Sequence, residues 1–258
     1  MSLLILTSTS KTLNSDVHRF KDTKLNTSPA FLNESEKVMN YLNLMDVSDL
    51  QSLMKVSEPI ARECKDWIES WSALKHHKDI AVPAIHMYRG TIFNQISPST
   101  YSVSQQRYIQ NSLRILSGLY GILRPYDRVL PYRLEMKTKL MLNDRHTRLD
   151  LFWKGLVTDS LNKDTIKTNS NIIVNLSSDE YFKAIDIDLL TSSIINIDFK
   201  EWDKGKLKSV AVYSKQARGA FIEYMVRNEI YEIKDLRNFR ELGYDIYSNS
   251  DEEIVFAR

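Results

Sequence analysis

Apolar and polar positions alternate along the chain in a way that predicts interleaved strands and helices. Short apolar runs predict strands at 3–7, 80–85, 172–176, 194–199 and 207–213, and weaker strands at 244–247 and 253–257. Apolar residues at helical spacing predict helices within 34–54, after Pro59, and at 105–116, 149–161 and 214–230. No linker or repeat divides these elements, so we expect one mixed α/β domain over residues 1–258, with a mixed sheet flanked by helices.

Composition narrows the class of protein. The 258 residues carry 35 Lys and Arg against 33 Asp and Glu, which excludes a generic polycation. A single cysteine, Cys64, excludes an intramolecular disulfide framework and a multi-cysteine zinc site. No apolar run reaches the roughly 18 residues of a membrane helix, and the run at 3–6 is too short for a signal peptide. We therefore expect a cytoplasmic protein without a membrane partner.

Glycine is scarce, with 7 in the chain, and two of them lie three residues apart at Gly118 and Gly121. One interpretation of the segment 113–136 is a helix-hairpin-helix-like element, in which glycines let backbone amides approach a phosphate. The other is a single helix whose glycines permit close packing against a neighbour. The pattern alone leaves both open.

Charge is concentrated around these glycines. Residues 105–148 contain nine basic and three acidic groups, whereas residues 226–258 contain five basic and eight acidic groups. Such a polarised surface attracts polyanions even at a small net charge. Tyr120, Tyr126 and Tyr132 recur among the arginines, a composition suited to contact with sugar-phosphate or bases. A solvated basic face with half-buried tyrosines is the alternative.

Several spaced blocks make the chain resemble the YaaA peroxide-stress protein family over its whole length. The longest block is 113–140, and the others are Ser10-Lys11-Thr12-Leu13, Leu151-Phe152-Trp153, the segment from Asn175 to Lys183, and Lys215-Gln216-Ala217-Arg218-Gly219. The resemblance implies a curved single domain with a basic cleft and a helix-hairpin-helix-like element. It also implies binding of DNA, with double-stranded DNA as the expected partner, and protection from hydrogen peroxide by limiting iron-driven damage.

The resemblance assigns DNA or anion binding to particular residues of this chain. These are Lys11, Arg114, Gly118, Gly121, Arg124, Arg133, Lys183, Lys215 and Arg218. Two blocks depart from the family pattern. Ser8-Thr9-Ser10 stands where the family has Ser-Pro-Ala, and Thr91 stands where it has an acidic residue. If that acid serves a reaction, this chain has lost or altered it.

An enzyme acting on a small anionic metabolite is the alternative function, with Lys11, Lys183, Lys215 and Arg218 lining its pocket. Lys11 or Lys183 would be the candidate catalytic base or nucleophile. The segment 175–183 lies at a strand-to-helix transition, where α/β folds place ligand sites. Ser178 or Asp179 acting only as a helix N-cap would also explain these residue types.

Metal and redox chemistry have little support in the sequence. The histidines His18, His76, His77, His86 and His146 contain no pair spaced four residues apart, so we expect no metal site and no cofactor. Cys64 lies in a predicted helix near Trp67, and we expect it to be a small core residue instead of a redox sensor.

Overall fold

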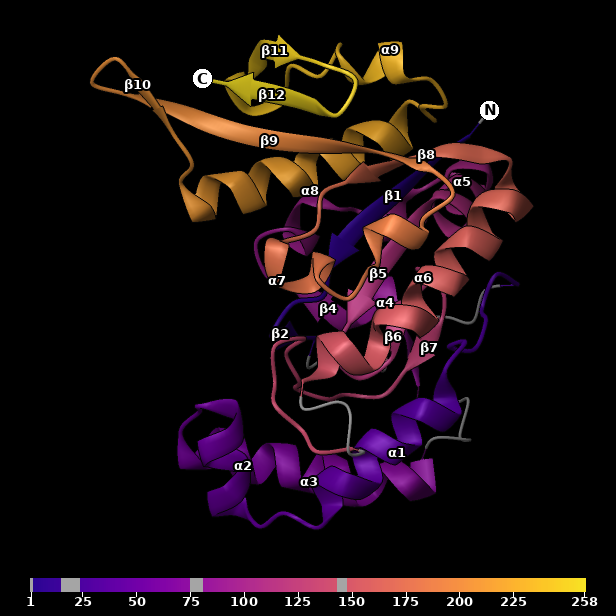
Figure 1. Cartoon of the computed structure of the whole chain (residues 1–258), viewed down its shortest axis with the longest axis vertical. Helices are drawn as coiled ribbons and strands as arrows, with labels where there is room; N and C mark the ends of the chain where they lie inside the picture. Colours follow the sequence, from indigo (N-terminus) through magenta and orange to yellow (C-terminus); the bar gives the residue numbers. More distant parts are fainter. Residues whose placement is uncertain (1, 15–23, 75–80, 143–147) are drawn as a thin grey trace.

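The computed structural model describes residues 2–14, 24–74, 81–142 and 148–258. Within these ranges the chain forms a sheet of eight strands (Figure 1). Five neighbouring strands are parallel, in the order β12 (Glu253–Ala257), β9 (Ser193–Asp203), β8 (Ser170–Asn175), β1 (Ser2–Ser8) and β5 (Leu113–Ser117). Antiparallel strands border them, namely β11 (Asp245–Asn249), β10 (Lys206–Lys208) and β6 (Gly121–Leu123). Two small ladders pair β2 (Thr12–Leu13) with β4 (Tyr88–Arg89) and β3 (Val82–Pro83) with β7 (Arg128–Val129).

Helices cover the sheet and extend the molecule at one end. The long helices are α5 (Val103–Ser112), which packs on β1, α6 (Leu149–Thr168), which packs on β6 and β8, and α8 (Ala211–Arg227), which packs on β9. α1 (Leu32–Asn43), α2 (Val47–Met54) and α3 (Glu58–Leu74) form a group at the end opposite β11 and β12 (Figure 1). Short helices are α4 (Ala84–Met87), α7 (Asp179–Phe182) and α9 (Ile233–Leu236), with 3-10 turns at Phe93–Gln95, Pro98–Thr100, Ile187–Leu189 and Glu241–Gly243.

The mixed α/β class predicted from the sequence is confirmed, and the strand predicted at 253–257 has these bounds in β12. The strand predicted at 80–85 is shorter, because only Val82–Pro83 pairs before α4 begins. The helix predicted at 105–116 ends at Ser112, where the chain enters the sheet as β5. All five residues of β5 are buried between two neighbouring strands, so an apolar run that also fits helical spacing is used as a central strand.

The order of the parallel strands creates a crevice. From β1, the chain next enters the sheet at β5 on one side and later at β8 on the other side. The direction of strand addition therefore reverses between β1 and β8, and open α/β sheets bind ligands outside the carboxyl ends of strands at such a point. The loops that follow Ser8 and Asn175 meet there. None of the helices in the described ranges is both long and apolar enough to span a membrane.

Candidate functional site

The segment that contains Gly118 and Gly121 is a buried β-hairpin, which corrects the prediction of a helix-hairpin-helix-like element. β5 and β6 pair antiparallel through Ser117 and Gly121. A Cβ atom at Gly118 would lie 2.5 Å from the carbonyl oxygen of Leu134, and one at Gly121 would lie 2.7 Å from the Trp153 ring. Gly121 also has a φ of 70°. Both glycines are buried, and close packing of the backbone requires them.

The tyrosines of this region are buried as well. Tyr120 and Tyr126 are each 1% exposed and Tyr132 is 6% exposed, so none of them presents a ring for base contact. The Tyr132 hydroxyl lies 2.6 Å from Ser117 Oγ and 2.8 Å from the Tyr88 hydroxyl. Burial raises the pKa of Tyr132 and Tyr88 well above the ordinary value. This network stabilises the core beneath the carboxyl end of β5.

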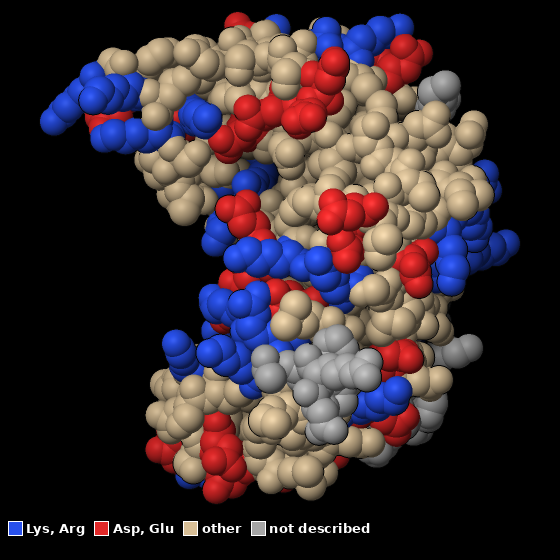
Figure 2. Space-filling view, viewed as in Figure 1, with Lys and Arg blue, Asp and Glu red and all other residues tan. Residues whose placement is uncertain are grey.

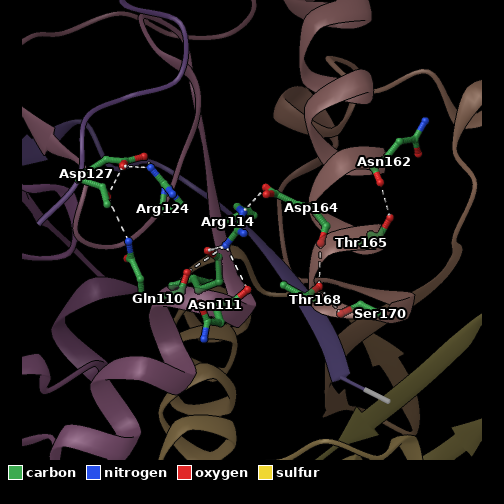
Figure 3. Close-up of polar contacts among 12 residues, drawn as sticks. Gln110, Asn111, Arg114, Arg124, Asp127, Asn162, Asp164, Thr165, Thr168 and Ser170 are labelled. Atoms are coloured by element: carbon green, nitrogen blue, oxygen red, sulfur yellow. Dashed lines mark hydrogen bonds and ion pairs between the residues drawn. The ribbon is translucent and has the colours of Figure 1, made fainter. Parts of the chain in front are cut away.

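Arg114 has a structural role that its sequence position did not reveal (Figure 3). Its side chain is buried, and Nε donates to Asp164 Oδ2 over 2.6 Å. One terminal nitrogen donates to the carbonyls of Gln110 and Asn111 in the last turn of α5. A cation that binds these carbonyls satisfies the free acceptors at a helix C-terminus. Arg114 is consequently separated from solvent and does not reach the cavities described below.

Arg124 is also engaged in the fold (Figure 3). Its guanidinium donates to Asp127 Oδ1 over 3.1 Å, and its backbone amide donates to Oδ2 of the same carboxylate over 2.8 Å. Thr27 donates a hydrogen bond of 2.5 Å to Asp127 as well. Burial raises the pKa of Asp127, and the contact with Arg124 opposes that shift. Arg124 neutralises a buried carboxylate, and it lines none of the cavities described below.

Three adjoining cavities form a groove along one side of the molecule (Figure 2). The cation-rich cavity, of about 650 Å³, lies between α2 and residues 133–139. The central cavity, of about 530 Å³, shares Lys11, Glu135 and Lys137 with it. The α8 cavity, of about 640 Å³, shares Ser178, Lys215 and Arg218 with the central one. Figure 2 shows Lys and Arg side chains gathered in the hollow, with carboxylates among them.

Residues 132–140 build the wall between two of these cavities by alternation. Tyr132, Leu134, Met136, Thr138 and Leu140 are buried, and the charged residues between them line the groove: Arg133, Glu135, Lys137 and Lys139. A period of two places successive side chains on opposite faces of an extended segment. This alternation is visible in the sequence and could have identified Glu135, Lys137 and Lys139 as groove residues. The prediction instead centred on Gly118 and Gly121 and did not use it.

A chain of ion pairs crosses the shared wall. The two oxygens of Glu135 lie 2.5 Å from Lys11 Nζ and 2.9 Å from Lys137 Nζ, and Lys137 also lies 2.9 Å from Glu180. Burial raises the pKa of Glu135, but the hydrogen bonds from the two lysines lower it by more, so it is below its usual range. Lys11 and Lys137 are thus largely matched by carboxylates.

Other cations of the cation-rich cavity are not matched in this way. Within the described ranges, Lys55 and Lys139 have no carboxylate within 4.0 Å, and Arg133 makes only a 3.5 Å contact with the carbonyl of Lys11. Arg148 also lines the cavity but pairs with Asp150. Among the described residues, six basic residues line this cavity against one acidic residue, Glu135. The excess positive charge can attract phosphates.

The ends of β1 and β8 supply hydroxyl groups to the central cavity. Ser8 Oγ accepts a 3.0 Å bond from the Ser178 amide and lies 3.4 Å from the Ser178 hydroxyl. Ser178 precedes α7, but its side chain does not cap that helix. Thr9 donates to the Tyr181 hydroxyl over 3.2 Å, and burial raises the pKa of Tyr181 to about 12. Thr91, the departure from the family pattern, lines the same cavity.

Helix α8 presents Lys215 and Arg218 to the central and α8 cavities. Gly219 lets this helix approach the backbone just before the 3-10 turn Phe93–Gln95, since a Cβ there would lie 2.2 Å from the Ile92 carbonyl oxygen. Lys11, Arg133, Lys215 and Arg218 of the predicted set therefore line one groove. Lys183 is exposed after α7 but is outside the lining of all three cavities.

Cys64 is 1% exposed, and burial raises its thiol pKa to about 11, so the prediction of a core residue is confirmed. No group of three or more His, Cys, Asp or Glu suited to a metal ion occurs within the described ranges. His18, His76, His77 and His146 lie outside those ranges.

Comparison with known proteins finds relatives over nearly the whole chain. The family described as "Peroxide stress protein YaaA" matches residues 3–250. A UPF0246 protein of Saccharophagus degradans is 36% identical over 260 aligned positions, covering 99% of each chain. UPF0246 proteins of Aliivibrio fischeri (36% identity, 94% of this chain and 92% of the relative) and Crocosphaera subtropica (34%, 99% and 100%) are similar over nearly their whole lengths.

Proposed function

The chain belongs to the YaaA peroxide stress protein family, and from this premise we propose that it binds DNA through the cation-rich cavity. Membership is consistent with a role in peroxide stress. In this proposal the protein binds double-stranded DNA largely without sequence preference and limits iron-driven damage by occupying it. The binding surface is the groove wall at 133–139 and the adjoining Lys55, whereas the glycine hairpin is part of the core.

The observation that supports this proposal most directly is the imbalance of charge in the cation-rich cavity. Six basic residues face one carboxylate, and three of the six, Lys55, Arg133 and Lys139, have no carboxylate partner in the described ranges. Lys and Arg side chains that displace the counterions of DNA phosphates provide most of the sequence-independent affinity of proteins for DNA. The buried tyrosines leave no stacking platform here, so contact with the phosphate backbone is favoured over contact with bases.

The salt dependence of affinity tests this proposal. Fluorescence anisotropy of a labelled duplex should give a slope of log K against log[salt] near −4 to −5, if about 4–6 phosphates are contacted. Replacing Lys55 and Lys139 by Ala should make the slope about 2 less steep, since each phosphate contact contributes about 0.9. Duplexes of unrelated sequence should bind alike.

Lys167→Ala is the matched control, because Lys167 is an exposed lysine in the last turn of α6, away from the groove lining. It should leave the slope unchanged. Absence of duplex binding at low salt, or an identical slope in the Lys55→Ala/Lys139→Ala protein and the control, would refute the proposal.

A further inference from the structure

The central cavity has features of a small-ligand site that the binding of duplex backbone does not require. It lies outside the carboxyl ends of β1 and β8, where the order of strand addition reverses. Its volume of about 530 Å³ is within the range of roughly 300–1,000 Å³ for small-molecule sites. Ser8 and Ser178, 170 residues apart in the chain, meet at its floor.

The charges that face this cavity leave two cations unmatched. Lys11 and Lys137 are held by Glu135 and Glu180, so these four charges largely cancel. The remaining charged residues of the lining are Lys215 and Arg218, which make no ion pair with the described residues, although Asp179, Asp198 and Glu253 line the adjoining α8 cavity. A pair of unmatched cations in a concave site is complementary to a ligand with two negative charges.

Arg218 is the more unusual of the two. Its guanidinium makes no hydrogen bond or ion pair with the described residues, and its Nε is fully buried. Burial lowers the pKa of Arg218, and the charges of Asp198 and Asp179 in the α8 cavity partly oppose this shift. A buried donor without an acceptor is unfavourable, and an anion bound at the part of Arg218 that lines the cavity would offset that cost electrostatically.

Hydroxyl donors complete the site. Ser8 accepts the Ser178 amide, and the two hydroxyl oxygens lie 3.4 Å apart, so at most one of their two protons is used between them and the other is available to a ligand. Gly90, with a φ of 102°, keeps the opposite wall open beside Ser10, because a Cβ there would lie 2.6 Å from Ser10 Oγ. Guanidinium, ammonium and hydroxyl donors around one concavity are the groups that bind phosphate oxygens.

We propose that the central cavity binds a phosphate monoester, with Arg218 and Lys215 neutralising the phosphate and Ser8 and Ser178 donating to its oxygens. A monoester carries a charge between about −1.5 and −2 at neutral pH, which matches the two free cations, whereas a monocarboxylate carries only one charge. The ligand is a nucleoside monophosphate or sugar phosphate, or the terminal phosphate of a DNA strand. This site depends on other cations than the proposed duplex-binding surface.

Isothermal titration calorimetry of the full chain tests the site with AMP and ribose 5-phosphate, and with adenosine as the ligand that lacks phosphate. AMP and ribose 5-phosphate should bind, and adenosine should not. Lys215→Ala and Arg218→Gln should each weaken AMP binding about tenfold or more, while Lys167→Ala, outside the groove lining, leaves it unchanged. At pH values below about 6 the affinity for AMP should decrease, because the monoester loses one negative charge there.

If the Arg218→Gln variant does not fold, the Lys215→Ala variant alone tests the site, because Lys215 is exposed. Equal binding of adenosine and AMP, no binding of either phosphate at low salt, or wild-type affinity for AMP in Lys215→Ala would overturn the site.

A duplex with a 5′-phosphate distinguishes a DNA end from a small molecule as the source of the phosphate. Tighter binding than its 5′-hydroxyl counterpart, lost in Lys215→Ala, assigns the phosphate to a DNA end, and equal binding assigns it to a small molecule. Loss of duplex affinity in Lys55→Ala/Lys139→Ala concerns only the duplex-binding proposal.

Discussion

Lys11 Nζ lies 2.5 Å from Glu135 Oε1, which ties the loop after β1 to the groove wall. Arg133, 122 residues from Lys11 in the chain, also contacts the Lys11 carbonyl. The Glu135 side chain is 15% exposed, and its second oxygen holds Lys137. One carboxylate therefore reduces the positive charge of both the cation-rich and the central cavity.

Glu135→Gln should strengthen duplex binding. Removing this carboxylate frees Lys11 for phosphate contact and leaves Lys137 with Glu180 as its remaining partner. One charge interaction near the surface contributes on the order of 1 kcal/mol, or about fivefold in affinity. Anisotropy titrations at low and high salt measure the change, which should shrink as salt rises. Glu69→Gln, on the exposed surface of α3, is the control. Unchanged affinity in Glu135→Gln would show that this wall does not contact DNA.

Arg114→Ala should act on stability and not on DNA affinity. The change leaves Asp164 and two carbonyls of α5 without their donor, and breaking a largely buried pair costs about 3 kcal/mol. Urea denaturation measures the loss, and the slope of affinity against salt should match that of the wild type. A flatter slope of affinity against salt in the folded variant would instead show that Arg114 contacts DNA.

Gly121→Ala should destabilise the fold by about 2–4 kcal/mol. A residue with a Cβ is strained at a φ of 70°, and the new methyl group would overlap the Trp153 ring. Gly155→Ala is the matched control, because Gly155 lies in α6 with open space around its Cβ position, so alanine should stabilise by up to about 1 kcal/mol. Chemical denaturation distinguishes the two. A neutral effect of Gly121→Ala would contradict the packing described for the hairpin.

Stability should fall as the pH is lowered from 6.5 to 4, in part because of His86. Burial, followed by the nearby Arg89, lowers its pKa to about 4 from the ordinary 6.5. Between these values the unfolded chain binds a proton that the folded chain does not, so stability present above pH 6.5 is lost as pH falls, by at most about 1.4 kcal/mol per unit. His86→Gln should flatten the dependence measured by denaturation across this window. The same pH dependence in the variant and the wild type would exclude His86 as its source.

Cys64 should resist thiol reagents and peroxide in the folded protein. Its thiol is buried and its pKa is about 11, so little thiolate exists at neutral pH. Reaction with a disulfide reagent should be slow in buffer and complete in denaturant. Cys64→Ala should keep the duplex affinity of the wild type before and after peroxide treatment. Rapid modification of the native protein would mean that the helix packing around Cys64 opens readily.

Much of the secondary structure could be predicted because it follows from local spacing. The runs at 172–176 and 253–257 are bounded by polar residues and become β8 and β12 within one or two residues of the predicted limits. The helix predicted over 105–116 was wrong for residues 113–116, because an apolar run fits both a helix and a central strand. The choice between them is made by β1 and β6, which flank β5 in the sheet.

The sequence by itself determined which segments are apolar and that basic residues are abundant in 105–148, since both are properties of residues close together in the chain. Only the tertiary structure decided which cations are free. Arg114 is neutralised by Asp164 50 residues away, whereas Lys139, in the same basic segment, has no such partner among the described residues. Electrostatic neutralisation depends on distance through space and on burial, and the folding of distant segments sets both.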